Sequence, residues 1–263
     1  MIESIGIIGT GSIAADVVDG LCTAPEPSPA IHLSPRNARI AEALARRHPD
    51  VHVCIDNQSV VDAAELLLLA VRPDAVREAL TGLRVPDGRV LISAVAGWSV
   101  EALRAQLDAD VTVVRSIPLP AVRHQRGVTA LHPAHPAAEE VFDRLGGALA
   151  VDDPTTFDAL SAATATISTH LHYLGAVADW IARQGMEPRA AESYVRSMFS
   201  GVNVSLADQS TGLSELGRAH ETPGGNNEAL RARWFDSQNR AALDEALEHI
   251  RRRVAASTSE WAR

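Results

Sequence analysis

Short apolar runs alternate with helical patterns along residues 1–152 of the chain. A β-branched run at Ile5–Ile8 ends in glycines, and amphipathic segments follow at Arg39–Arg47, Asp74–Leu83 and Val100–Leu107. Near-continuous apolar strands that alternate with helices are typical of a parallel sheet covered on both faces. The further strands that we expect are Ala30–Leu33, Val51–Ile55, Leu66–Val71, Arg89–Ala94, Val111–Arg115 and Val128–Leu131.

Helical patterns alone fill residues 153–263. Apolar residues recur at spacings of three and four from Phe157 to Ile181, which predicts one continuous helix with a long apolar seam. A seam of that length is typical of a helix that packs against another subunit. Further helices are expected from Pro188 to Asp208, from Glu228 onward and over Ala241–Val254.

Composition narrows the range of functions. The net charge is −9 and the pI is near 5.5, so the surface would repel the phosphates of a nucleic acid. No apolar stretch reaches the roughly 18 residues of a membrane span, and the N-terminal residues carry no basic segment typical of a signal peptide. Cys22 and Cys54 are too sparse for a disulfide framework, which fits the reducing cytoplasm. The chain contains no lysine, which excludes Schiff-base chemistry.

A glycine-rich turn follows the first expected strand. Residues Gly9 to Ala14 fit the pattern G-x-G-x-x-A at the start of a helix. Gly9 permits a tight turn, and Gly11 lets a pyrophosphate approach the backbone and the helix N-terminus. The residues that we expect to hold a dinucleotide there are Gly9, Thr10, Gly11, Ser12 and Ile13.

The end of the second strand indicates which dinucleotide binds. A carboxylate at this position would accept hydrogen bonds from the ribose 2′-hydroxyl of NAD. This chain carries Ser34, Arg36 and Asn37 there instead. A hydroxyl and a guanidinium suit a 2′-phosphate, so we expect NADPH to be preferred over NADH. The alternative is a solvated arginine at the start of a helix.

These patterns predict an α/β protein with two domains. Residues 1–152 form an N-terminal Rossmann-type, doubly wound, mostly parallel sheet that binds the dinucleotide beyond the carboxyl ends of its strands. Residues 153–263 form an all-helical C-terminal domain, whose long apolar seam predicts dimerisation and to which the resemblance described below adds a substrate role. The expected partners are a small-molecule substrate and a second copy of the chain, with no nucleic acid and no membrane.

Several segments, taken in order, resemble the pyrroline-5-carboxylate reductase family. Leu67–Pro73 resembles its L-A-V-K-P strand end, and Asp56-Asn57 resembles the segment after its third strand. Ile92–Gly97 is similar to its I-S-x-x-A-G strand, and Val114–Pro118 to its V-R-x-M-P. Thr222–Asn227 resembles its S-P-G-G-x-T signature in the helical domain. The resemblance spans nearly the whole chain.

The resemblance implies reduction of a cyclic imine with NAD(P)H, as in proline biosynthesis, by a homodimer that interleaves its helical domains. It implies further dinucleotide contacts from Asn57, Ala70, Val71, Arg72, Pro73, Ala96, Gly97 and Pro118. It also implies that the loop of Thr222, Pro223, Gly224, Gly225 and Asn226 offers backbone amides to a substrate carboxylate. Thr164 and Thr166, in the first turns of the long helix, would line the substrate wall.

The chain departs from the family around the substrate. The family's V-R-x-M-P-N-T-P becomes Arg115–Pro120, which loses the asparagine. Its S-G-S-G-P-A-Y stretch becomes Thr164–His170, without the glycines and the proline, and its loop threonine is matched by Asn227. We therefore expect a paralogue with a shifted substrate, a small imine that carries a carboxylate.

Imine reduction also needs a proton at nitrogen, from a side chain or from water. His170 and Tyr173 lie off the apolar seam and are candidate donors; a packed histidine is the alternative for His170. Asn227 can hydrogen-bond but cannot titrate. Asn226 and Asn227 could equally be turn residues and a helix N-cap.

No metal site is expected, because the paired histidines at His132/His135 and His170/His172 have no carboxylate or cysteine at ligand spacing. Two other functions stay open. One is a different NADP-dependent reduction, of a ketone or a deazaflavin. The other is a non-catalytic dinucleotide-binding sensor, against which the retained T-P-G-G segment argues.

Overall fold

A computed structural model describes residues 2–261 of the chain. Its internal contacts divide the chain into two compact units. The sheet unit comprises residues 1–161 together with 251–263, and the helical unit comprises residues 162–250. The division falls after residue 161 rather than after 152, and the end of the chain clusters with the sheet unit.

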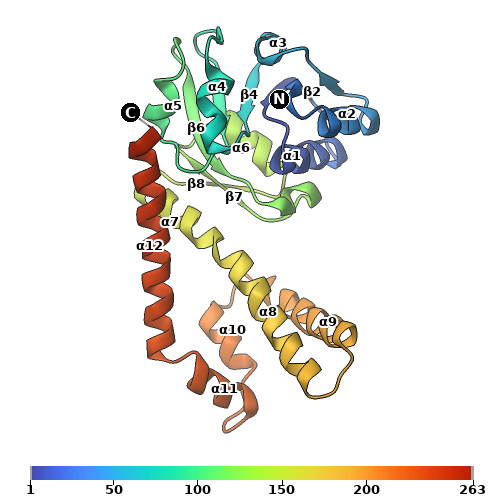
Figure 1. The fold of residues 1–263 in the computed structure, drawn as a ribbon, viewed down its shortest axis with the longest axis vertical. Coiled ribbons are helices and arrows are strands. Elements are labelled where there is room, and N and C mark those ends of the chain that lie inside the picture. The colour runs from blue at the N-terminus through green and yellow to red at the C-terminus, as the bar shows by residue number, and fades with distance from the viewer. Residues whose placement is uncertain (1, 262–263) are drawn as a thin grey trace. The chain divides into compact units, whose positions relative to one another are not determined.

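An eight-stranded sheet forms the centre of the sheet unit, in the order β3-β2-β1-β4-β5-β6-β7-β8 (Figure 1). The first six strands in this order are parallel, β7 is antiparallel to β6, and β8 is parallel to β7. All seven expected strands are present, which confirms the mostly parallel sheet. The strands are β1 Ser4–Ile8, β2 Ala30–Leu33, β3 Val51–Val53, β4 Leu66–Leu69, β5 Val90–Ser93, β6 Thr112–Ile117, β7 Thr129–His132 and β8 Ala148–Ala150.

Two apolar clusters cover the two faces of this sheet. Successive strand residues point to opposite faces, so Ile7 packs in one cluster with Phe142, and Ile8 packs in the other with Trp98. All four leucines of β4 are buried, as expected for a strand covered on both sides. The sequence pattern does not predict the eighth strand, because it holds one large apolar residue, Leu149, between two alanines; in the structure Leu149 is 46% exposed.

The helices of the sheet unit cover both faces. The helix expected over residues 74–83 is a 3-10 turn followed by a short α-helix that ends before Gly82, which has a φ of +73°. The helical elements are α1 Ser12–Thr23, η1 Pro35–Asn37, α2 Ala38–Arg47, α3 Asn57–Ala63, η2 Pro73–Ala75, α4 Val76–Leu80, α5 Val100–Arg104, η3 Pro120–His124, α6 Pro136–Asp143 and α7 Pro154–Thr164.

The prediction of one continuous helix from Phe157 to Ile181 is wrong. The chain breaks at Ala165, between α7 and α8 (Thr166–Arg183). The Ala165 N–H donates to the Ala162 carbonyl, and the Thr166 hydroxyl donates to the Ala163 carbonyl at 2.7 Å. A threonine hydroxyl that donates a hydrogen bond to a backbone carbonyl competes with the N–H groups of the helix for that carbonyl. Such competition favours a break in the helix.

The helical unit continues with α9 Pro188–Leu206, α10 Leu213–Ala219, α11 Asn226–Trp234 and the first part of α12 Ser237–Trp261. Helices α8 and α9 pack on each other through buried Ala178, Ala191 and Val195. Within residues 2–261, the helices are too short or too polar to cross a bilayer.

Candidate functional site

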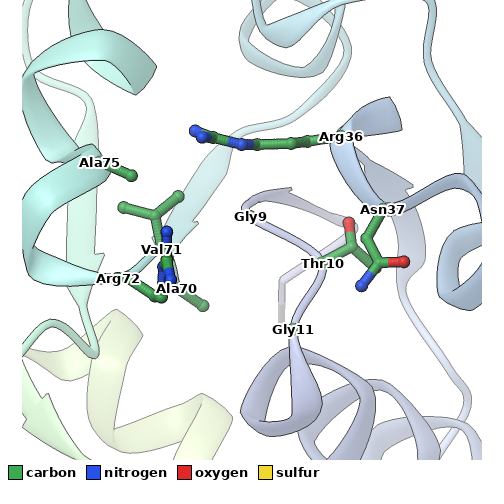
Figure 2. A pocket seen from close by; sticks show the side chains of 9 residues that line it. All are labelled: Gly9, Thr10, Gly11, Arg36, Asn37, Ala70, Val71, Arg72 and Ala75. Atoms are coloured by element: carbon green, nitrogen blue, oxygen red, sulfur yellow. The ribbon is translucent and has the colours of Figure 1, made fainter.

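A cavity of about 330 Å³ opens where β1 and β4 end side by side in the sheet (Figure 2). The strand order reverses between these two strands, since β2 and β3 lie on one side and β5 and β6 on the other. Open α/β sheets bind ligands at such a point, beyond the carboxyl ends of the strands. The residues lining the cavity are Gly9, Thr10, Gly11, Arg36, Asn37, Ala70, Val71, Arg72 and Ala75, all expected from the sequence except Ala75.

The two glycines of the turn have different roles. Gly9 has a φ of +96°, and an added Cβ would lie 2.5 Å from Val71 Cγ1 and 2.8 Å from the Ala70 carbonyl carbon. Only glycine fits this close approach between the β1 turn and the end of β4. At Gly11 the nearest atom to an added Cβ is the Ala70 oxygen at 4.0 Å, so the space above it is open.

Ser34 supports the turn from below rather than lining the cavity. It is 1% exposed, and its Oγ accepts a hydrogen bond from the Gly9 N–H at 2.8 Å. The Thr10 hydroxyl donates to the Ser34 carbonyl at 2.9 Å. The expectation that Ser34 faces a 2′-phosphate is therefore corrected, because its hydroxyl is committed to the neighbouring turn.

Arg36 reaches over the cavity from η1, as Figure 2 shows. Its Nη2 lies 3.2 Å from Glu78 Oε2 on α4, with the two side chains 50% and 73% exposed. Arg72 Nη2 lies 3.4 Å from Oδ2 of Asp74, two residues further along the chain. The sequence did not indicate Glu78 as a site residue. Arg36 follows β2 and Glu78 follows β4, and these two elements come close only because β2 and β4 flank β1 in the sheet.

A dinucleotide fits this cavity on the chemistry of its walls. Gly11 caps α1 without a side-chain hydrogen bond, and the first turn of α1 holds no acidic residue. The N–H groups at the start of α1 are therefore available to phosphate oxygens, and the helix dipole favours negative charge there. Ser12 and Ile13 belong to this first turn but do not line the cavity, and Arg36 and Arg72 add two guanidinium groups to its walls.

The remaining expected dinucleotide residues do not line the cavity. The Asn57 side-chain amide donates to the Ala79 carbonyl at 3.1 Å, and the Pro73 carbonyl accepts from Trp98 Nε1 at 3.1 Å. Ala96 and Gly97 form a turn after β5, and Pro118 follows β6 directly. These last three lie beyond the next strands along the sheet, so their contact with a nicotinamide stays a prediction.

In the helical unit, the Thr222–Gly225 loop is a tight turn. The Gly225 N–H donates to the Thr222 carbonyl at 2.8 Å, with Pro223 and Gly224 (φ +72°) in the middle, as in a type II turn. The Gly224 N–H donates to Glu228 Oε2 at 2.7 Å. Two of the amides expected to receive a substrate carboxylate are thus already bonded within the unit.

The expected asparagines begin α11 behind this turn. Asn226 is its first residue, while Gly225 is the N-cap. Asn227 Nδ2 donates to the His220 carbonyl at 2.6 Å, which joins α11 to the end of α10. Asn227 therefore has a structural contact, but the N-cap that the structural alternative expected at one of these asparagines is Gly225 instead.

His170 and Tyr173 belong to a cluster of rings in the helical unit. Tyr173 stacks on Trp234 with 5.3 Å between ring centroids, and Phe199 meets the His170 and Tyr173 rings edge-on. Thr166 turns its hydroxyl to the backbone, and Thr164 ends α7. The cluster joins α8, α9 and α11, which sequence spacing alone did not indicate.

Arg115 and Asp158 form a buried ion pair that the sequence analysis missed. Arg115 Nη2 lies 2.9 Å from Asp158 Oδ1, and the two side chains are 7% and 13% exposed. The guanidinium also lies 4.4 Å over the Phe157 ring centroid. The pair ties β6, next to Pro118, to α7.

The comparisons with known proteins agree with this architecture. Residues 4–97 match the family described as NADP oxidoreductase coenzyme F420-dependent. Over 246 residues the chain is 26% identical to the pyrroline-5-carboxylate reductase of Haemophilus influenzae, covering 89% of this chain and 90% of that protein. The match spans less than half of two other relatives: 24% of pyrroline-5-carboxylate reductase 1 of Dictyostelium discoideum and 44% of the Pasteurella multocida enzyme, at 28% and 32% identity.

Solved structures share the fold over the whole chain. The pyrroline-5-carboxylate reductase of Coxiella burnetii superposes with a TM-score of 0.82 at 18% identity, covering 98% of both chains. The Plasmodium falciparum pyrroline carboxylate reductase, solved with NADP bound, gives a TM-score of 0.79 at 13% identity, covering 98% of this chain and 100% of that one. The chain is thus similar over most of its length to a pyrroline-5-carboxylate reductase, and it shares the fold of that family's solved structures.

Proposed function

We propose that this protein is an NADPH-dependent reductase of a small cyclic imine whose substrate differs from that of its relatives. The observation that carries the proposal is the cavity at the β1/β4 switch point, walled by the Gly9–Gly11 turn and spanned by Arg36. The full-length likeness to a pyrroline-5-carboxylate reductase supports the choice of reaction. The departures at Thr164–His170 and Asn227 support the shift of substrate.

When bound, a reduced nicotinamide supplies the hydride. The chain's own task is then to hold the dinucleotide and orient the acceptor. The N–H groups at the start of α1 would bind the pyrophosphate, and the Arg36 guanidinium would bind the 2′-phosphate in exchange for Glu78. The lack of a carboxylate at the end of β2 supports NADPH over NADH.

The proton for the imine nitrogen would come from the Tyr173 hydroxyl, from a His170 ring nitrogen or from water. Both side chains can donate through a hydrogen bond, whereas the Asn227 amide can only orient the acceptor. A Tyr173→Phe variant that keeps normal turnover would remove Tyr173 from this role. His170→Gln, which keeps a hydrogen-bonding group but cannot titrate, tests the histidine in the same assay.

A deazaflavin acceptor is the second candidate. The family description matched by residues 4–97 names coenzyme F420, although that match covers only the part of the chain around the cavity. A sensor that binds the dinucleotide without turnover is the third candidate, and the assay must distinguish it from the two reductases.

A homodimer formed through the helical unit belongs to the same proposal. This unit exposes large apolar side chains, with Leu171 at 62%, Trp180 at 57% and Leu213 at 74%. Burial of such residues against a second copy would remove them from water. Light scattering should give twice the chain mass, and Leu171→Glu should lower it while Leu149→Glu on β8 leaves it unchanged. A monomeric wild-type protein would contradict the proposal.

The deciding experiment follows NADPH oxidation with a panel of acceptors: pyrroline-5-carboxylate, unsubstituted 1-pyrroline, a keto acid and a deazaflavin. Turnover with an imine other than pyrroline-5-carboxylate supports the proposal, and efficient turnover of pyrroline-5-carboxylate itself would restore a role in proline biosynthesis. Preference for the deazaflavin supports the second candidate. NADPH binding without oxidation of any acceptor would leave the sensor.

A further inference from the structure

A second groove lies on the sheet unit at the far end of α1 from the glycine turn. Its volume is about 830 Å³, and it shares no lining residue with the dinucleotide cavity. Thr23, which lines it, lies about 16 Å along the helix from Ser12 at 1.5 Å per residue. The residues lining the groove are Asp19, Thr23, Arg47, His48, Arg123, His124, Gln125 and Arg126.

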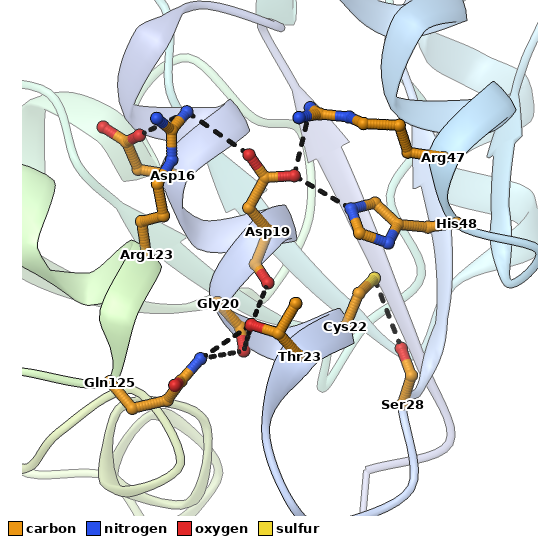
Figure 3. A network of polar contacts seen from close by, with 10 residues as sticks. All are labelled: Asp16, Asp19, Gly20, Cys22, Thr23, Ser28, Arg47, His48, Arg123 and Gln125. Carbon is orange, nitrogen blue, oxygen red and sulfur yellow. Dashed lines mark hydrogen bonds and ion pairs between the residues drawn. The ribbon is translucent and has the colours of Figure 1, made fainter.

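Asp19 gathers basic side chains from two other elements into this groove (Figure 3). Its carboxylate, 10% exposed, lies 3.1 Å from Arg47 and 2.8 Å from His48 at the end of α2. Arg123 of η3 approaches its other oxygen at 3.3 Å and also lies 3.0 Å from Asp16. A buried carboxylate needs such partners, so α1 fixes the arginines in place before any ligand arrives.

The other wall of the groove is held equally firmly. Gln125 has a φ of +49°, and its side-chain amide donates to the Gly20 carbonyl at 2.7 Å and to Thr23 Oγ1 at 3.0 Å. A Cβ added at Gly20 would lie 2.3 Å from the Val122 carbonyl oxygen, so η3 rests directly on the backbone of α1. His124 and Arg126 flank Gln125 and are exposed at the rim.

Positive charge remains in excess after these pairs are counted. Three arginines line the groove, while two carboxylates pair with them: Asp19 with Arg47 and Arg123, and Asp16 with Arg123. Among residues 2–261 no acidic side chain pairs with the third arginine, Arg126. Arg47 and Arg123 are 54% and 45% exposed, and each guanidinium has five N–H donors, more than these ion pairs use. This basic concentration stands out on a chain whose net charge is −9.

We propose that this groove binds a small polyanion, a molecule with several phosphate or carboxylate oxygens, at a site separate from the dinucleotide. Guanidinium forks match both oxyanions, and the fixed walls lower the ordering cost of binding. Arg126 is the residue of choice for a test, because it contributes charge to the groove without taking part in the Asp19 network.

The test measures binding of inorganic triphosphate and of citrate by calorimetry, with the dinucleotide site saturated by NADP⁺. We expect binding by the wild-type protein, about tenfold weaker binding by Arg126→Ser, as for the loss of one charge-assisted hydrogen bond, and unchanged binding by the control Arg84→Ser. The stronger of the two anions identifies phosphate or carboxylate as the natural group. Both variants should have the melting temperature of the wild type, since both side chains are exposed.

Three results would overturn the proposal: no binding of either anion at physiological salt, equal binding by wild type and Arg126→Ser, or binding that occurs only when NADP⁺ is left out. The last would place the probe in the dinucleotide cavity. The comparison of Arg126→Ser with Arg84→Ser needs no turnover, so it stands whether or not the imine-reductase proposal does.

Discussion

Replacement of Arg36 by serine should reduce affinity for NADPH and leave affinity for NADH unchanged. A hydrogen bond between a guanidinium and a phosphate oxygen contributes about 1.5–3 kcal/mol. The ion pair that Arg36 gives up is with Glu78, and with side chains 50% and 73% exposed it is worth about 0–1 kcal/mol. The net loss of about 0.5–3 kcal/mol corresponds to a roughly 2- to 160-fold weaker Kd for NADPH.

Glu78→Gln provides the opposite test of the same reasoning. It frees Arg36 and removes a negative charge, so NADPH should bind up to about fivefold more tightly. Both effects are measured by fluorescence titration with NADPH and NADH, with Arg84→Ser as the control for loss of one exposed arginine. Equal weakening of both dinucleotides in Arg36→Ser, or tighter NADH binding in Glu78→Gln matching that of NADPH, would refute the assignment of the 2′-phosphate to Arg36.

Four further predictions follow from the contacts. Gly9→Ala should weaken NADPH binding and lower the melting temperature, because the added Cβ would overlap the end of β4. Gly11→Ala should weaken NADPH binding alone, so equal melting temperatures for the two variants would contradict this reasoning. Asp158→Ala leaves the buried Arg115 without its ion-pair partner, so the free energy of unfolding measured in urea should fall by about 3–5 kcal/mol. A fall of less than about 1 kcal/mol would mean that water reaches Arg115. Glu228→Ala frees a loop amide, so the KM of a carboxylate-bearing imine should fall several-fold while that of 1-pyrroline stays constant. Hydrogen bonds from Ser59 lower the pKa of Asp56 in the folded state, so the stabilisation by Asp56 is present at neutral pH and is lost as the pH falls below about 4. The difference in free energy of unfolding between the wild type and Asp56→Ala should therefore be smaller at pH 3 than at pH 7.

Local pattern was sufficient for most of the sheet unit. Strand β4 is a run of four leucines, and β1 is an apolar run that ends in the glycine turn. The hydrophobic period and the turn-forming residues depend only on positions close together in the sequence, so the sequence alone reveals them. The same holds for Arg36 and Asn37, whose place after the second strand put them at the mouth of the cavity.

Elements without a strong local signal escaped prediction. Strand β8 has two alanines and an exposed leucine, and it exists because β7 offers it a partner. The break at Ala165 runs against an unbroken apolar seam, since the Ala165 N–H and the Thr166 hydroxyl each donate to a carbonyl three residues earlier. In both cases hydrogen bonding outweighs the apolar period.

The sequence by itself determined the fold class, the glycine turn and most of the residues around the dinucleotide cavity. Only the tertiary structure decided which way side chains turn and with whom they pair: Ser34 under the turn, Arg36 with Glu78, Arg115 with Asp158, and three basic residues around Asp19. The physical reason is that these partners come from elements far apart in sequence. Their meeting depends on strand order and helix packing, which no local period encodes.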